Sequence, residues 1–459
     1  MAIIRSFCLN LWEYTIYLGC RNILIERSVL FILYQKSIVK RNVAIMWFAN
    51  FFISGSMTMV MPFISLYIQS LGDFSETYVQ NWSGWIFAIT FVTAFIFAPI
   101  WGRISDQYGR KKILIISATG LAISVLLMGY AKSVWHLFLL RLIMGVFTGF
   151  IPMSQALISI QTRKEIAGRV LGTLQTGSIT GTLLGPLLGG SLADFIGFSS
   201  TFKWTSLTIF LSALIVMFGI KEIQYKVASH VEATSYTRIE VLRHIIKSPV
   251  LIVVLLISAL IQIAHFSIQP ILSLYVIEIN GPQNIALMSG LAFSVAGLGN
   301  LFLAKRWGQL GDKIGYVKIM ILLLFMASIF YFPAAFVTNI WQLITLRFFL
   351  GIAIGGLVPV RVAYIRQSAP LAMQGEVIGY NTSLRFLGNI FGPMLGGFIS
   401  GIFGISSVFY VTSGLLMASG ILLLLAWIKN EKQSYSLRSM KKLIENLHHK
   451  VLYFTKKIL

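Results

Sequence analysis

Long apolar stretches alternate with short polar ones from about residue 44 to about residue 428. A helix that crosses the hydrocarbon core of a bilayer needs roughly 20 predominantly apolar residues, and most of these stretches reach that length. The pattern therefore predicts about twelve membrane-spanning helices. We place them at 44–70, 82–101, 113–131, 135–158, 168–193, 200–220, 249–278, 285–304, 318–337, 341–364, 375–401 and 405–428.

Three segments lie outside this pattern. Residues 1–43 form an N-terminal extension whose apolar runs are too short to span a bilayer. It is predicted to be a cytosolic or interfacial extension, or an artefact of an upstream start assignment, and the alternative is a functional amphipathic anchor. Residues 221–248 are polar and predict a cytoplasmic linker, and the basic residues 429–459 predict a cytoplasmic tail that is solvated or lies on the membrane surface. The linker separates two six-helix units, 44–220 and 249–428.

One costly string of glycines and a proline occurs in both units. Glycine costs about 1 kcal/mol and proline about 3 kcal/mol inside a helix in water. In lipid, small residues let helix backbones approach, and neighbouring helices can satisfy a carbonyl that a proline bend frees. The string predicts two equivalent bent helices at the boundary between the units. Its members are Gly181, Gly185, Pro186, Gly189 and Gly190 in the first copy, and Gly388, Gly392, Pro393, Gly396 and Gly397 in the second.

Other residues keep the same register. Trp135, Arg141 and Gly145 recur 206 positions later, at 341, 347 and 351, and the glycine string recurs 207 positions later, from 181 to 388. Chance periodicity of apolar residues does not repeat tryptophans and arginines in this way. The sequence therefore predicts an all-α membrane protein of two pseudo-symmetric six-helix bundles.

Composition agrees with a lipid environment. Of the 459 residues, 57% are hydrophobic and only 11% are charged, against about 25% in soluble domains. The net charge of +22 would suggest nucleic acid in a soluble protein. Here lysine and arginine concentrate in alternate loops, so the charge indicates basic cytoplasmic loops beside anionic lipid, with both termini in the cytoplasm and no nucleic-acid partner.

The loop between the second and third spans is a candidate conformational latch. Gly102 and Gly109 permit a tight turn, and Asp106 lies within reach of Arg110 and Lys111. Such a charge cluster can hold two bundles together in one state and release them in another. The alternative is an ordinary basic cytoplasmic loop. The second half keeps Asp312 but has Tyr316 and Val317 in place of the two cations.

These motifs resemble those of a known family. The loop at 102–112 resembles the signature loop of the major facilitator superfamily. Arg141 with Gly145 and Gly149 resembles the fourth-helix motif of its drug–proton antiporters, and residues 181–190 resemble their fifth-helix motif. The resemblance covers about 44–428 and implies the major facilitator fold, a central cavity, alternating access and proton-driven export in the bacterial plasma membrane. In this family the arginine at 141 is implicated in proton transfer.

Several residues are candidates for coupling and substrate binding. Arg141 and His265 are the intramembrane candidates for proton coupling, with Asp106 as a third. Arg141 could instead extend to the outer interface, and His265 could simply bond a neighbouring helix. Nine further residues are candidates for the cavity wall because their side chains are polar, aromatic or methionine. They could equally be ordinary packing residues. They are Asn50, Met57, Met61, Phe63, Gln175, Gln262, Gln269, Arg347 and Arg385.

Acidic residues are absent from the first, fourth and seventh predicted spans away from their ends. This departs from cation exporters that hold a carboxylate in the cavity. With Arg141, Arg347 and Arg385 inside, we expect the cavity to tolerate neutral or anionic compounds.

No P-loop, metal-ligand cluster or hydrolase motif is found, so we expect neither enzyme activity nor a cofactor. The prediction is a monomeric secondary transporter that exports drugs or toxic small molecules in exchange for protons, with membrane lipids around it. The alternatives are a facilitator for one metabolite and a transport-inactive membrane receptor.

Overall fold

The computed structural model describes residues 38–162, 164–222, 237–281, 283–370 and 373–458. Within these ranges it does not describe the side chains of residues 433–458, nor those of a few other residues such as Asp106. It contains twelve helices long and apolar enough to cross a membrane among these residues, which confirms the predicted number.

The helices follow the predicted order. In the first half they are 38–59, η1 (Met61–Phe63), α2 (Ile64–Ser70), α3 (Glu76–Tyr108), α4 (Arg110–Met128), α5 (Val134–Val146), α6 (Phe150–Gln161), α7 (Lys164–Ile196) and α8 (Phe198–Gly219). In the second half they are α9 (Arg238–Lys247), α10 (Pro249–Ser267), α11 (Leu272–Asn280), α12 (Ile285–Ile314), α13 (Tyr316–Tyr331), η2 (Pro333–Ala335), α14 (Ile340–Ser368), α15 (Gln374–Phe403) and α16 (Ile405–Ile458).

Several ends differ from the predictions. The first helix already includes residues 38–43, because Asn42 is held by Gln161 Oε1 at 2.8 Å and by the Lys221 carbonyl at 2.7 Å. The helix α12 runs to Ile314 rather than 304, since charged residues continue a helix beyond the apolar span. Within the predicted linker, α9 forms behind a capping box of Thr237 and Glu240, a pattern that is visible in the sequence.

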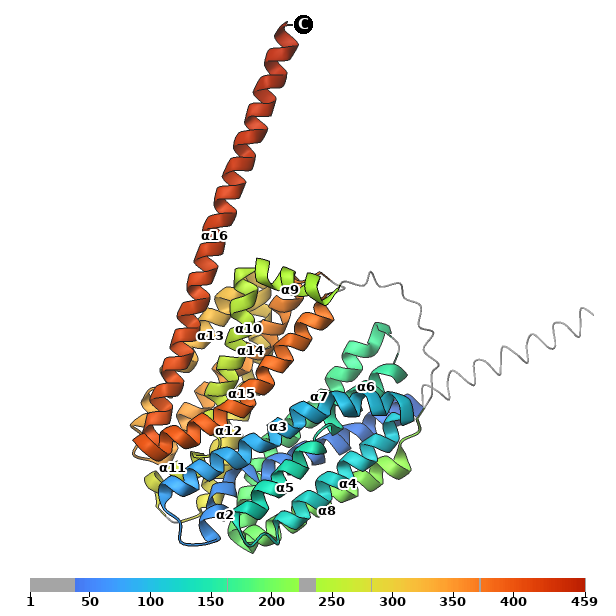
Figure 1. Cartoon of the computed structure of the whole chain (residues 1–459), viewed down its shortest axis with the longest axis vertical. Coiled ribbons are helices and arrows are strands. Elements are labelled where there is room, and N and C mark those ends of the chain that lie inside the picture. The colour runs from blue at the N-terminus through green and yellow to red at the C-terminus, as the bar shows by residue number, and fades with distance from the viewer. Residues whose placement is uncertain (1–37, 163, 223–236, 282, 371–372, 459) are drawn as a thin grey trace, which may run out of the picture.

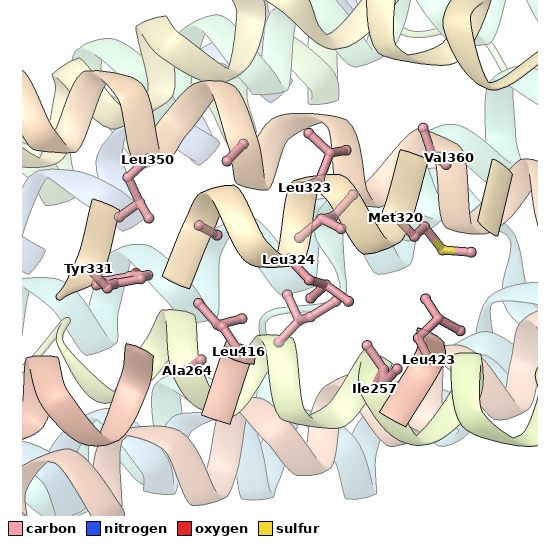
Figure 2. Packing of buried hydrophobic residues seen from close by; sticks show 14 of the residues in the cluster. Ile257, Ala264, Met320, Leu323, Leu324, Tyr331, Leu350, Val360, Leu416 and Leu423 are labelled. Carbon is pink, nitrogen blue, oxygen red and sulfur yellow. The ribbon is translucent and has the colours of Figure 1, made fainter. Parts of the chain in front are cut away.

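Each half has its own apolar core. One cluster runs from Met46 to Ile220, with Ala286 as an additional member, and the other runs from Val241 to Leu423. Figure 2 shows the second cluster, in which Leu323 and Leu324 of α13 lie among side chains of α10, α14 and α16. The two halves are therefore separate bundles.

Equivalent contacts recur in both bundles. Trp101 Nε1 donates to the Val146 carbonyl at 2.6 Å, and Trp307 Nε1 donates to the Ile352 carbonyl at 3.1 Å, each pair 206 positions apart from its equivalent. The first span of each half is interrupted near a proline, at Pro62 and at Pro270. The pseudo-symmetry predicted from the repeat is thus present in three dimensions.

The bundles meet at one end and diverge at the other (Figure 1). We call the diverging end, with Arg103, Lys111, Lys221 and α9, the basic end, and the end with Asp194 and Gly401 the opposite end. The boundary consists of α3 against α15 and α7 against α12.

The repeated glycine string builds this boundary. A Cβ on Gly189 or Gly396 would collide with the backbone of the first helix of its own bundle, at Met59 or Ser267. A Cβ on Gly190 would collide instead with Ala286 of the other bundle. Both glycine-proline helices therefore lie at the bundle boundary, as predicted, and pack closely on two sides.

Candidate functional site

A cavity of about 420 Å³ lies between the two bundles. Its walls come from the first helix, η1 and α7 on one side and from α10, α12, α14 and α15 on the other. A hollow of about 520 Å³ beside Pro333, Phe336 and Trp341 lies away from the boundary and has no charged residue in its wall. The central cavity is the better candidate site because residues of both bundles line it and several of their polar groups converge on it.

Three basic side chains line the cavity. They are His265 of α10, Arg347 of α14 and Arg385 of α15, and no aspartate or glutamate lies among the described lining residues. Arg347 is only 3% exposed, and its Nε and Nη2 atoms have no hydrogen-bond partner among the described residues. Its guanidinium lies 5.8 Å from the centre of the Phe293 ring.

Amide side chains surround these charges. Gln262 Nε2 donates to Asn389 Oδ1 at 2.8 Å, which links α10 to α15 across the wall. Gln269 and His265 lie one helical turn apart, with 3.4 Å between Nε2 atoms. On the other side, Gln155 donates to Gln175 Oε1 at 2.6 Å. These bonds orient polar groups that would otherwise rotate freely.

The structure places most, but not all, of the cavity candidates in the wall. Met61, Gln175, Gln262, Gln269, Arg347 and Arg385 line it. Three others do not. Asn50 is buried and accepts a hydrogen bond from Ser154 at 2.9 Å, Met57 packs against the core of the first bundle, and Phe63 stacks on Phe198.

The coupling candidates are separated. His265 lies in the cavity wall, but Arg141 is buried within the first bundle, 5.6 Å from the Phe87 ring centre. Arg141 is 4% exposed, and its Nε and Nη2 lack partners within the described residues. It therefore does not extend to the interface. The side chain of Asp106 lies outside the description.

The predicted latch region is built on two turn glycines. Gly109 and Gly315 have φ of 96° and 100°, which favours glycine over other residues. The helix that follows Gly109 receives the carboxylate of Glu222, which accepts from the Arg110 amide at 2.7 Å and the Lys111 amide at 3.2 Å. In the second half, Asp312 instead accepts from the Tyr316 hydroxyl at 2.5 Å. A Cβ at Gly102 would meet nothing within 4 Å.

At the opposite end the bundles are joined by hydrogen bonds. Asp194 accepts from the amides of Ala286 at 3.3 Å and Leu287 at 2.8 Å, at the start of α12. Thr77 donates to the Gly401 carbonyl at 3.1 Å, and Ser273 donates to the Pro62 carbonyl. These contacts hold the two bundles together at the opposite end.

Two charged residues with unusual surroundings were not anticipated from the sequence. Glu222 follows the sixth span, and only the folded chain brings it to the amides after Gly109. Arg361 lies in α14 and is 1% exposed, with Nε, Nη1 and Nη2 unpartnered among the described residues. The signal for Arg361 was present, since it is a charge inside a predicted span.

The Major Facilitator Superfamily model matches residues 46–306 and 281–455. This chain belongs to the Major Facilitator Superfamily. The repeat, the twelve spans and the cavity at the bundle boundary are therefore features of a superfamily transporter fold, and superfamily membership places the chain among multi-pass membrane transporters.

Similar proteins include two bacterial relatives. The chain is 52% identical over 393 residues to the uncharacterized MFS-type transporter YuxJ of Bacillus subtilis, covering 85% of this chain and 99% of that one. It is 40% identical over 388 residues to the multidrug resistance protein MdtG of Salmonella schwarzengrund, covering 83% and 94%. A solved bacterial homologue of the human lysosomal transporter Spinster, in an inward-facing and occupied conformation, matches with a TM-score of 0.71 at 15% identity, covering 86% and 97%, and shares the fold.

Proposed function

We propose that this protein exports several drugs or toxic small molecules by proton antiport with alternating access. The observation that carries the proposal is the polar cavity between two pseudo-equivalent bundles that meet at one end only. The name of the 40% identical relative, a multidrug resistance protein, supports the substrate class.

The orientation follows from charge. Arg103, Lys111 and Lys221 lie at the basic end, and by the positive-inside rule we infer that this end faces the cytoplasm. The cavity then opens inward, so a substrate can enter from the cytoplasm or the inner leaflet. This arrangement suits export.

His265 is the proton carrier that the geometry favours. Among the described lining residues it is the one whose ordinary pKa lies close to neutral pH, and its Nδ1 has no partner in that set. Arg141 would act electrostatically, because arginine effectively never loses its proton.

The test uses proteoliposomes with imposed gradients. A dye that is a drug analogue should be transported when an inward proton gradient is imposed, and a protonophore should abolish that transport. Transport of one metabolite only, without dependence on the gradient, would favour the facilitator alternative. An inert result for all compounds, with the purified chain folded, would favour a receptor.

A further inference from the structure

Among the described residues that line the cavity, every basic side chain belongs to one bundle. Arg347, Arg385 and His265 belong to the second bundle, whereas the first bundle contributes uncharged residues such as Met61, Gln175 and Ser178. Arg361 extends this basic side. It follows the cavity-lining residues Ile354 and Val358 on α14 at helical spacing.

No described protein group neutralises these guanidinium groups. Arg347 Nε and Nη2, Arg385 Nε and all three Arg361 nitrogens lack a hydrogen-bond partner among the described residues, and no carboxylate lies among the described cavity residues. Buried polar atoms are nearly always bonded, and an unpaired charge in a membrane interior is costly. The Phe293 face offsets part of this cost only, since a cation–π contact contributes about 0.5–2 kcal/mol.

The remaining wall has a different character. Ile179, Leu183 and Pro186 of α7 lie opposite the arginines and present apolar surface. A ligand that matched both sides would carry its negative group toward α14 and α15 and its apolar part toward α7. Guanidinium groups suit carboxylate, sulfonate and phosphonate oxygens because their fork of donors can bind two oxygens at once.

We propose that Arg347 and Arg385 form a binding subsite for the anionic group of an organic anion, with Arg361 adding to the positive field. The inference rests on the proposed export function, because it names a substrate class for that same cavity. It does not depend on which ion drives transport.

The test measures binding rather than transport. The full chain is purified into lipid nanodiscs and titrated calorimetrically with naphthalene-2-sulfonate, with the neutral naphthalene-2-sulfonamide and with the cationic naphthyltrimethylammonium. We expect the sulfonate to bind most tightly. The variants Arg385→Gln and Arg347→Gln should each weaken its binding roughly ten- to hundredfold.

Controls separate charge from misfolding. Binding of the sulfonamide should stay unchanged in both glutamine variants, Arg385→Lys should recover part of the affinity, and Lys203→Gln, which removes a cation 4.5 Å from the Tyr130 ring, should bind the sulfonate as the unaltered chain does. Loss of sulfonamide binding along with sulfonate binding would show that the glutamine variant is damaged. In that case the sulfonate affinity of Arg385→Lys decides whether a positive charge at this position is needed. A cation that binds as tightly as the sulfonate, or glutamine variants with unchanged sulfonate affinity, would overturn the subsite.

A second titration distinguishes an organic ligand from a small resident anion. If chloride also occupies the subsite, potassium chloride should lower sulfonate affinity more than potassium fluoride, whose small anion is strongly hydrated, does at equal ionic strength. Equal effects of the two salts assign the subsite to organic anions. Failure of proton-driven transport with intact sulfonate binding would remove the antiport mechanism and leave the subsite standing.

Discussion

The two bundles share a scaffold and differ in chemistry. Arg141 over Phe87 and Arg347 over Phe293 are equivalent contacts, with distances of 5.6 and 5.8 Å. Only Arg347 lines the cavity. Duplication therefore preserves packing contacts, while the surface that faces a substrate is free to diverge.

The divergence is clearest at positions related by the repeat. Pro62 and Pro270 are 208 positions apart, and the same spacing pairs His265 with Met57. A spacing of 207 pairs Arg385 with Ser178. The basic member of each pair belongs to the second bundle, so we expect substitutions at these two positions to change transport more than substitutions at their first-bundle partners.

The largest expected effect breaks the shared scaffold. Gly189→Leu and Gly396→Leu should each destabilise the protein by about 3 kcal/mol or more, because the new side chain would collide with backbone rather than with a flexible side chain. Thermal unfolding in detergent measures the loss. Gly414→Leu is the control, since a Cβ there meets nothing within 4 Å. Similar losses of stability in Gly189→Leu and Gly396→Leu, with none in Gly414→Leu, would support equivalence of the bundles. Unchanged stability of Gly396→Leu would contradict it.

The next effect concerns the closed form of the basic end. Gly290 of α12 lies against Pro186 of α7. Gly308 lies 18 residues after Gly290, and Gly168 lies 18 residues before Pro186. Because α7 and α12 run antiparallel, Gly308 and Gly168 should meet when the basic end closes, although a Cβ on either would now meet nothing within 4 Å. Gly308→Leu should lower transport at least roughly tenfold while binding persists.

Cross-linking checks this pairing directly. In a chain with Cys8 and Cys20 replaced by serine, cysteines at 168 and 308 should form a disulfide that increases when transport is energised. The pair 172 and 308 is the offset control. A disulfide yield independent of energisation would argue against alternating closure.

A comparable effect tests the position that pairs His265 with Met57. His265→Met installs the residue type of the first bundle and should reduce proton-coupled export roughly tenfold or more, because the proposed proton carrier is lost. Proton uptake by proteoliposomes is the measurement, and Met57→Leu is the matched control. Unchanged proton uptake in His265→Met would exclude His265 as the carrier.

The smallest effect lies at the opposite end. Asp194→Asn keeps the shape but removes the charge from the bonds to Ala286 and Leu287. A charge at an exposed helix start contributes about 0.3–1 kcal/mol, so the ratio of closed to open forms at this end should fall roughly two- to fivefold. Spin-label distances across this end measure the shift. Thr77→Val, which loses one neutral bond to Gly401, should shift it less.

Much of the fold was predictable because it is local or repeated. Spans follow from runs of apolar residues, and the boundary helices follow from a glycine string that recurs intact. Helix ends were less predictable, since α12 continues as a charged helix to Ile314 and Asn42 is tied to a distant carbonyl. Neither feature produces an apolar run.

The site was predictable only in part, because helix rotation decides which residues face the cavity. Met61 and Met57 lie one turn apart in sequence, yet only Met61 lines the wall, since the helix is interrupted near Pro62. The contact of Glu222 with the amides after Gly109 spans 112 positions, and no local pattern announces it.

A wall with guanidinium groups and no described carboxylate has an electrical consequence. The interior of a bacterium is negative, and each elementary charge gains or loses about 2.3 kcal/mol per 100 mV across the membrane. A singly negative cargo leaving the cell moves down this voltage. Its expulsion would therefore draw on the resting potential itself, and cells clamped near zero millivolts should retain more of it.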